Sequence, residues 1–262
     1  VQLIDFGDLP VFEEATTYPC ILLSRRGAAP AGHAVQAITM PELRTDDLAA
    51  FVQANALHIP QRTLVRNAYR IASDSSSAVL DKIREAGVPL GEYLNGKVYW
   101  GIKTGYNKAF VIDAATRDRL IAEDARSVEV IKPFLVGRDL SRYEKPTFNK
   151  YLILFAKGST HNAHGMLDEG QAFEKMLAQY PAVMRWLEPH AEPARARTDK
   201  GDYWWELRAC DYYDMFEQDK ILYPDIAPFP EFQLAQGSTY CGNTCYFIPS
   251  GEKHLLAVLN SK

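Results

Sequence analysis

The 262-residue sequence has no run of 18 consecutive apolar residues, so it offers no candidate for a membrane-spanning helix. Its four cysteines, at positions 20, 210, 241 and 245, are too few for a disulfide scaffold at this length and fit a reducing compartment. It also lacks an initiator methionine and the basic, apolar and small-residue regions of a signal peptide. These absences predict a cytoplasmic protein that does not contact a membrane.

An excess of positive charge is missing as well, because 29 Lys and Arg residues stand against 33 Asp and Glu residues, a net charge of −4. That balance on its own argues against a nucleic-acid-binding protein. Hydrophobic residues make up 47% and charged residues 24%, which excludes a disordered or collagen-like chain. The length predicts one large domain or two modest ones.

Both ends of the sequence lie within apolar patterns. The chain opens in the apolar run Val1–Phe6 and closes on an apolar helical pattern, His254–Lys262, that has no capping residue. We interpret the sequence as a portion of a longer protein.

The N-terminal 90 residues predict two strands followed by helices. The strands are expected at 1–6 and 18–23, and the segment GAAPAG at 27–32 has the composition of a flexible linker. One helix is expected to begin at a Thr45/Asp46 cap and continue through Val52. A second is expected to run from the Asp74–Ser77 cluster to Gly87, a C-terminal cap.

From Leu90 onward, strands and helices mix without regular alternation, which predicts an α+β fold with mainly antiparallel sheets and packed helices. The expected strands are 98–102, 109–112, 151–156, 220–223 and 245–248. The expected helices are 114–124 after the cap Asp113, 168–179, and 181–188 with Pro181 in its first turn.

The charges are unevenly distributed along the chain. Residues 97–157 contain 12 basic and 7 acidic side chains, net +5, whereas the flanking segments 1–96 and 158–262 carry −3 and −6. Lys and Arg in the basic segment are interleaved with Tyr, Trp and Phe, a mixture that can position phosphates and read base edges. The same pattern is typical of an ordinary solvated surface, so charge alone leaves both interpretations open.

Four blocks in the C-terminal part resemble one family in order and spacing. They are GKVYWGIKTGYNKAFVID (96–113), IKPFLVGRDLSRY (131–143), DYWWELRACDYYDMFEQDKILYPDI (202–226) and CYFIPSGEKHLLAVLNSK (245–262). Together they resemble the TaqI-like C-terminal specificity domain of adenine-specific DNA methyltransferases, especially the fused type IIG restriction–modification enzymes. The resemblance covers residues 91–262.

Residues 1–24 resemble the last strand pair of the adjoining methyltransferase domain in that family. The resemblance therefore implies three regions: methyltransferase strands at 1–26, a helical connector at 27–90 and a target-recognition domain at 91–262. In the family, an aromatic residue stacks on the adenine flipped out of the duplex, and Phe12 matches it. An aromatic face restores part of the stacking energy that an extruded base has lost. The alternative for Phe12 is a core aromatic at a strand end.

Two motifs of the family do not occur in the sequence: the catalytic Asn/Asp-Pro-Pro-Tyr/Phe motif and a glycine-rich segment for S-adenosylmethionine. The resemblance thus implies a non-catalytic region that holds no cofactor itself. The parent enzyme is expected to use S-adenosylmethionine, and Mg²⁺ if it also cleaves DNA. The expected partners are double-stranded DNA and the upstream methyltransferase domain.

The candidate DNA contacts combine cations with hydrogen-bonding side chains near turns: Lys103, Thr104, Asn107, Lys108, Arg138, Arg142, Tyr143, Arg195, Arg197 and Lys200. Each group has a structural alternative. Gly105 and Asn107 suit a turn, Arg138 can pair internally with Asp139, and 195–200 can be a solvated loop.

The block Tyr203–Arg208 contains adjacent tryptophans, Trp204 and Trp205. On a strand they would face opposite sides, so at least one is expected in the core. Two histidines, His161 and His164, and two cysteines, at 241 and 245, have no second pair at zinc-finger spacing, and we expect no metal.

Two other function classes remain open from the sequence. A protein- or carbohydrate-binding module would use exposed Tyr and Trp residues, since aromatic content is 11%, and would place them away from the basic loops. A hydrolase would need acid and base groups converging in a pocket, and no spacing of acidic residues singles them out.

Overall fold

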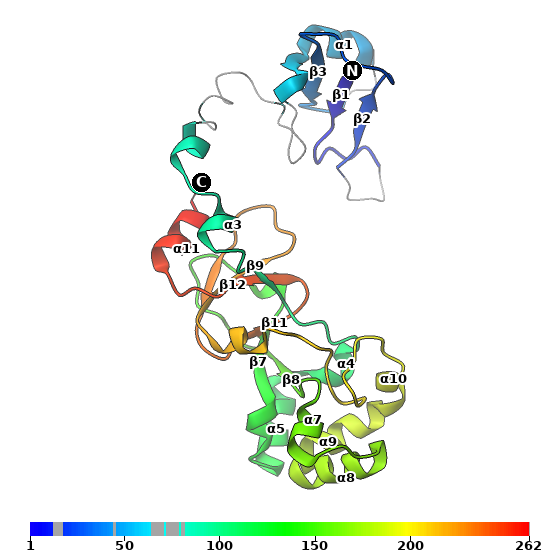
Figure 1. The fold of residues 1–262 in the computed structure, drawn as a ribbon, viewed down its shortest axis with the longest axis vertical. Helices are drawn as coiled ribbons and strands as arrows, with labels where there is room; N and C mark the ends of the chain where they lie inside the picture. Colours follow the sequence, from blue (N-terminus) through cyan, green and yellow to red (C-terminus); the bar gives the residue numbers. More distant parts are fainter. Residues whose placement is uncertain (13–17, 44–45, 64–70, 72–78, 80–81, 262) are drawn as a thin grey trace. The chain divides into compact units, whose positions relative to one another are not determined.

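The computed structural model describes residues 1–12, 18–43, 46–63, 71, 79 and 82–261 (Figure 1). The chain divides into two compact units, Val1–Pro89 and Leu90–Lys262. Among the described residues, no helix is long and apolar enough to cross a membrane.

The N-terminal unit is a four-stranded sheet with one helix packed against it. The strand order is β2 (Cys20–Leu23), β1 (Gln2–Asp5), β3 (Ala34–Thr39) and β4 (Leu57–Pro60). β1 runs antiparallel to β2 and parallel to β3, and β3 runs antiparallel to β4. The helix α1 (Leu48–Asn55) buries Val52 against Ile4, Phe6, Ile38 and Met40. A short 3₁₀ turn, η1 (Gln61–Thr63), follows β4.

The predicted strand pair is confirmed, but the assignment of 27–90 to a helical connector is wrong for its first half. β3 and β4 belong to the same sheet as β1 and β2, and we did not predict either strand. The cap of α1 is Asp47, whose Oδ1 accepts from the Ala50 N–H at 3.1 Å, rather than the predicted Thr45/Asp46. Of the second predicted helix, residues 82–86 are helical, and the Gly87 N–H bonds to the Ile83 carbonyl. Most of its earlier residues lie outside the described part.

The C-terminal unit contains two four-stranded sheets and surrounding helices, which confirms the α+β class. In the first sheet the order is β10 (Gln233–Ala235), β9 (Lys220–Pro224), β12 (Cys245–Ile248) and β5 (Tyr99–Trp100), antiparallel throughout. In the second it is β11 (Tyr240–Cys241), β7 (Ile131–Leu135), β8 (Lys150–Ile153) and β6 (Val111–Asp113). Only the β11–β7 pair is parallel in this sheet.

The α-helices of this unit are α3 (Leu90–Tyr93), α4 (Asn107–Phe110), α5 (Ala114–Glu123), α6 (Ser127–Val130), α7 (Ser159–His164), α8 (Glu169–Gln179), α9 (Pro181–Leu187), α10 (Ala191–Arg195) and α11 (Lys253–Leu259). The 3₁₀ turns are η2 (Gly137–Asp139), η3 (Glu188–His190) and η4 (Tyr213–Glu217). Asp113 and Asp168 cap α5 and α8 by accepting the N–H of the third helical residue, and Pro181 opens α9, as predicted.

Two local predictions are wrong. Ala109 and Phe110 complete the helical turn α4, so the strand predicted at 109–112 begins only at Val111. Trp204 and Trp205 lie in a turn rather than on a strand, and both are buried, with 2% and 0% of their surface exposed. The two indoles meet edge to face, with ring centroids 5.3 Å apart. A pair of buried tryptophans therefore supports the adjacent loops instead of presenting one ring to a ligand.

Candidate nucleic-acid interface

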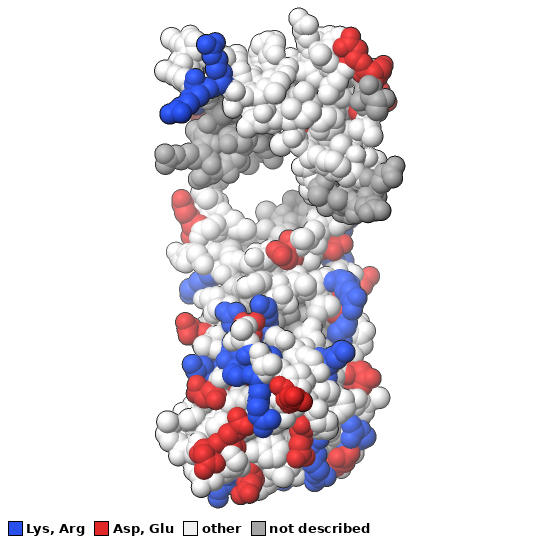
Figure 2. Space-filling model, turned by 90° about the vertical axis from the view of Figure 1, so that its right-hand side faces the viewer, with Lys and Arg blue, Asp and Glu red and all other residues white. Residues whose placement is uncertain are grey.

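Basic side chains gather on one part of the C-terminal unit. Figure 2 shows Lys and Arg around the middle of this unit, at the level of β7, β8 and α4 in Figure 1, whereas acidic and basic residues mix toward the α8–α9 end. This distribution agrees with the net positive charge of residues 97–157. The loops at this level therefore form the candidate interface.

Arg197 is the internal cross-link of these loops. Its guanidinium donates to the carbonyls of Thr104 at 2.5 Å, Trp204 at 2.6 Å, and Ala194 and Glu206 at 3.0 Å, and it lies 4.2 Å from the Phe110 ring centroid. Burial lowers its pKa to about 10, so it stays charged at neutral pH. We predicted Arg197 as a DNA contact in an exposed loop, but the residue is 7% exposed and donates four hydrogen bonds within the chain.

Glu206 holds a neighbouring group of backbone amides. Its carboxylate accepts from the N–H groups of Gly158 at 3.0 Å, Thr160 at 3.0 Å and Asp202 at 2.9 Å, and the side chain is fully buried. A buried carboxylate is tolerated when several donors satisfy it. Arg197 and Glu206 together connect 103–108, 158–160 and 194–206 into one support.

The loop Lys103–Lys108 lies on this support and mixes structural and exposed residues. Thr104 is 2% exposed, and its hydroxyl donates to Asn107 Oδ1 at 2.5 Å and accepts from the Tyr106 N–H at 3.2 Å. We predicted Thr104 as a DNA contact, but its side chain is turned inward, as the alternative of turn geometry requires. Lys103, Asn107 and Lys108 are exposed.

Lys103 meets a second cation through a shared carboxylate. Its Nζ lies 2.9 Å from Asp199 Oδ2, while Arg208 Nη1 lies 3.4 Å from Asp199 Oδ1. The hydrogen bond from Lys103 and the positive charges of Lys103 and Arg208 hold the pKa of Asp199 below its ordinary value. Sequence reasoning missed both Asp199 and Arg208, although Arg208 lies within the block 202–226 that carries the family resemblance.

Arg195 and Lys200 are exposed but are engaged within the chain. Arg195 Nε donates to Glu169 Oε1 at 2.8 Å, and its guanidinium lies 5.4 Å from the Trp204 ring centroid. Lys200 Nζ donates to the Arg195 carbonyl at 2.5 Å. Arg195 and Lys200 remain predictions as DNA contacts, and each would have to leave its present partner to bind a phosphate.

In the second predicted segment, 137–143, the Arg138 side chain is free to bind a ligand. Asp139 pairs with Lys150 at 2.6 Å and accepts from the Val136 N–H, so the internal Arg138–Asp139 pair that we considered does not form. Among the described residues, Arg138 has no hydrogen bond or ion pair, and its side chain is exposed. Arg142 lies 5.5 Å from the centroid of the Tyr143 ring, and Tyr143 is 74% exposed.

The turn 242–244 brings the two predicted segments together. Trp100 Nε1 donates to the Asn243 carbonyl at 2.7 Å, and the Gly137 N–H donates to Thr244 Oγ1 at 2.9 Å. Exposed Trp100, next to the Lys103 loop, and exposed Arg138 therefore flank one turn that is itself exposed at Asn243 and Thr244.

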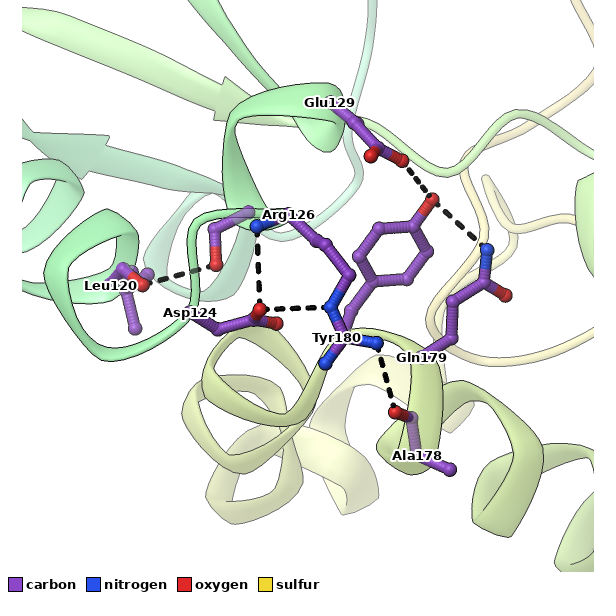
Figure 3. A network of polar contacts seen from close by, with 8 residues as sticks. Leu120, Asp124, Arg126, Glu129, Ala178, Gln179 and Tyr180 are labelled. Atoms are coloured by element: carbon purple, nitrogen blue, oxygen red, sulfur yellow. Dashed lines mark hydrogen bonds and ion pairs between the residues drawn. The ribbon is translucent and has the colours of Figure 1, made fainter.

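A polar network fixes the end of α8, the helix that carries Glu169, the partner of Arg195 (Figure 3). Tyr180 donates to Glu129 at 2.9 Å and accepts from Gln179 at 3.2 Å. Arg126 bonds both Asp124 at 2.9 Å and the Ala178 carbonyl at 3.4 Å. The network joins the α5–α6 segment to the end of α8, the helix whose Glu169 pairs with Arg195.

The remaining candidates lie elsewhere. Phe12, in the N-terminal unit, is 57% exposed, so it is not the core aromatic of the structural alternative. His164 bonds Gln179, and His161 lies against Met166 and the Tyr203 ring. Cys241 and Cys245 are buried free thiols, and burial raises the pKa of Cys241 well above its ordinary value. Within the described ranges, no group of three or more His, Cys, Asp or Glu residues could hold a metal ion.

The sequence of residues 132–262 matches the TaqI-like C-terminal specificity domain, which is half of the chain, and the chain belongs to this family. It is 28% identical over 174 residues to the Type II methyltransferase M.BanIII of Aneurinibacillus aneurinilyticus, covering 62% of this chain and 28% of that protein. A solved structure of the Type IIL restriction-modification enzyme MmeI in complex with DNA aligns with 99% of this chain and 31% of that one, at 13% identity and a TM-score of 0.44. The chain thus spans less than a third of the length of either protein.

Proposed function

We propose that this chain is the DNA sequence-recognition region of an S-adenosylmethionine-dependent adenine-N6 DNA methyltransferase of the restriction–modification type. The observation that carries the proposal is the match of 132–262 to a specificity domain. It is supported by exposed cations of the C-terminal unit, with Lys103 and Lys108 on the loop that Arg197 holds and Arg138 in η2. Cations of this kind position phosphates and, for Arg, read guanine edges in the major groove.

Methyl transfer belongs to another part of the parent protein in this proposal. Neither the Asn-Pro-Pro-Tyr motif nor a glycine-rich cofactor segment occurs in the 262 residues, so this chain supplies recognition and no chemistry. Exposed Phe12 is proposed to stack on the extruded adenine, because its ring is accessible. In this proposal the parent enzyme binds S-adenosylmethionine, and Mg²⁺ if it also cleaves DNA. It acts in the cytoplasm in defence against phage.

The alternative of a protein- or carbohydrate-binding module requires exposed aromatics away from the basic loops. Exposed Trp100 lies beside the loop of Lys103 and exposed Tyr143 lies against Arg142, whereas exposed Tyr18 and Tyr93 lie outside these loops. The position of Trp100 and Tyr143 next to cations favours nucleic acid at this surface, because bases and sugars offer apolar faces beside phosphates.

Binding of labelled duplex DNA by the chain and by the parent protein, measured at about 50 and about 200 mM salt, tests the proposal. We expect affinity to fall at least tenfold as salt rises. Arg138→Gln should weaken binding, whereas Arg185→Gln, an equal charge change on exposed Arg185 of α9, should not. Binding that is absent, or indifferent to salt, in the parent protein would overturn the proposal.

A further inference from the structure

The trio Lys103, Asp199 and Arg208 is arranged so that its cations remain available. The side chains of Lys103 and Arg208 are 49% and 48% exposed, whereas that of Asp199 is only 18% exposed. The carboxylate is therefore the least accessible member, and each cation keeps about half of its surface for another partner. The trio carries a net charge of +1.

Lys103 is distant in sequence from Asp199 and Arg208, and its loop is held against their segment by close packing. Gly105 has φ +71°, and a Cβ at this position would lie 3.2 Å from both Arg197 Cδ and Asp199 Cβ. Because the loop has no side chain there, it packs closely on the segment that contains Asp199. Arg197 then fixes the same loop through the Thr104 carbonyl.

A cavity of about 160 Å³ lies beside the trio. Its walls are formed by 100–103 and 208–213, so Lys103 and Arg208 both line it, together with the half-exposed indole of Trp100 and the exposed carboxylate of Asp211. A concave site with two converging cations suits a single anionic group better than an extended surface does.

We propose that Lys103 and Arg208 together bind one phosphodiester group of duplex DNA, and that Asp199 is the positioning residue that holds the two cations side by side. The inference rests on the proposed function and extends it by naming a phosphate site and a residue that acts through others. One phosphodiester charge neutralises the net charge of the trio.

Preorganisation is the physical reason for a carboxylate in such a site. Long Lys and Arg side chains lose rotamer freedom when they bind, and a partner that already orders them reduces that loss. Asp199 orders the Lys103 and Arg208 side chains, because its carboxylate is ionised at neutral pH and pairs with both. Its own negative charge, however, opposes DNA.

These two effects have opposite signs, which makes Asp199→Asn decisive. If Asp199 acts only through its charge, its removal tightens binding of a short duplex of randomised sequence. If it positions the cations, binding weakens about threefold or more, and Asp199→Glu restores part of the affinity. The matched control is Asp202→Asn, which removes a carboxylate 3.5 Å from Lys157. The control should bind as the unmodified chain does or up to about twofold tighter.

A second measurement counts phosphates. In the double variant Lys103→Met/Arg208→Met, the magnitude of the negative slope of log K against log salt should decrease by about 1 if both cations share one phosphate. It should decrease by about 2 if each cation contacts its own phosphate. The inference is overturned if Asp199→Asn binds the duplex with the same affinity as Asp202→Asn, or if the magnitude of the slope changes by about 2 or about 0. Either result leaves the proposed function intact. Absence of salt-sensitive duplex binding by the parent protein overturns both the inference and the proposed function.

Discussion

Arg197 and Arg208 belong to the same segment of the chain and carry the same charge, yet their environments assign them opposite tasks. Arg197 donates to four backbone carbonyls from a buried position, while Arg208 makes one ion pair at the surface. The sequence predicted Arg197 as a DNA contact because composition cannot distinguish a buried guanidinium from an exposed one. What distinguishes them is the path of the backbone around Thr104 and Trp204, which only tertiary structure defines.

Substitution of Arg197 should therefore affect stability rather than recognition. We expect Arg197→Met to lower the free energy of unfolding by about 3 kcal/mol, because buried carbonyls lose their donor. Arg208→Met should change it by about 0.5 kcal/mol or less, since an exposed pair contributes little. Denaturant unfolding of both variants checks this. A small loss for Arg197→Met would show that its hydrogen bonds are not formed in solution.

Lys220 gives a pH dependence with a definite sign. It is fully buried, its Nζ donates to the Gly237 carbonyl at 2.6 Å, and burial lowers its pKa from 10.5 to about 8, with Glu217 and Asp219 acting in the opposite direction. The unfolded chain thus binds the proton more tightly than the folded one between pH 8 and 10.5. The destabilisation is full below pH 8 and disappears as the pH rises toward 10.5.

We expect the free energy of unfolding to gain about 2 kcal/mol from Lys220 between pH 7 and 9.5. From about pH 8.5 the raised pKa values of Cys210 and Cys241 act in the opposite direction, and above pH 10 those of Tyr213 and Tyr240 do so as well. The measurement therefore stays below pH 10, and the contribution of Lys220 is the difference between the unmodified chain and Lys220→Met, which should lose the gain. An unchanged slope in the variant would assign the pH dependence to other groups.

At the scale of elements, the sequence predicted those helices and strands whose signals are local. The caps Asp113 and Asp168 begin α5 and α8, Pro181 opens α9, and β12 agrees with its prediction at both ends. β7 was missed because Pro133 interrupts its apolar run, and β10 and β11 are too short for any periodicity. β3 was missed because its stability comes from parallel pairing with β1, which local patterns do not reveal.

Close backbone approach joins β5 to the turn at 242. A Cβ on Gly101 would lie 2.0 Å from the Gly242 carbonyl oxygen and 2.7 Å from that of Cys241. We expect Gly101→Ala to destabilise the chain by about 3 kcal/mol, because the backbone must separate. Gly91→Ala, in α3 with no atom within 4 Å, should leave stability unchanged or raise it by about 0.5 kcal/mol. Thermal unfolding compares the pair, and equal stabilities would contradict this packing.

At the scale of the whole molecule, net charge is a poor guide to partners. The chain carries −4, but the net positive residues 97–157 lie within a unit whose loops present Lys103, Lys108 and Arg138. The family resemblance predicted the part of the chain that carries these loops, and the C-terminal unit begins at Leu90, one residue before the predicted start at 91. The sequence left open which side chains are free, because that depends on pairs such as Asp139–Lys150 that join separate strands and turns.

The central claim is that this chain reads DNA sequence, and selection from a pool of randomised duplexes tests it most directly. The chain of 262 residues is incubated with the pool near physiological salt, bound duplexes are amplified, and the cycle is repeated. The account predicts enrichment of one short motif, with weaker enrichment at one or more positions for Arg138→Gln. Retention of duplexes with no enriched motif would show binding through phosphates alone and would contradict the assignment of sequence recognition to this chain.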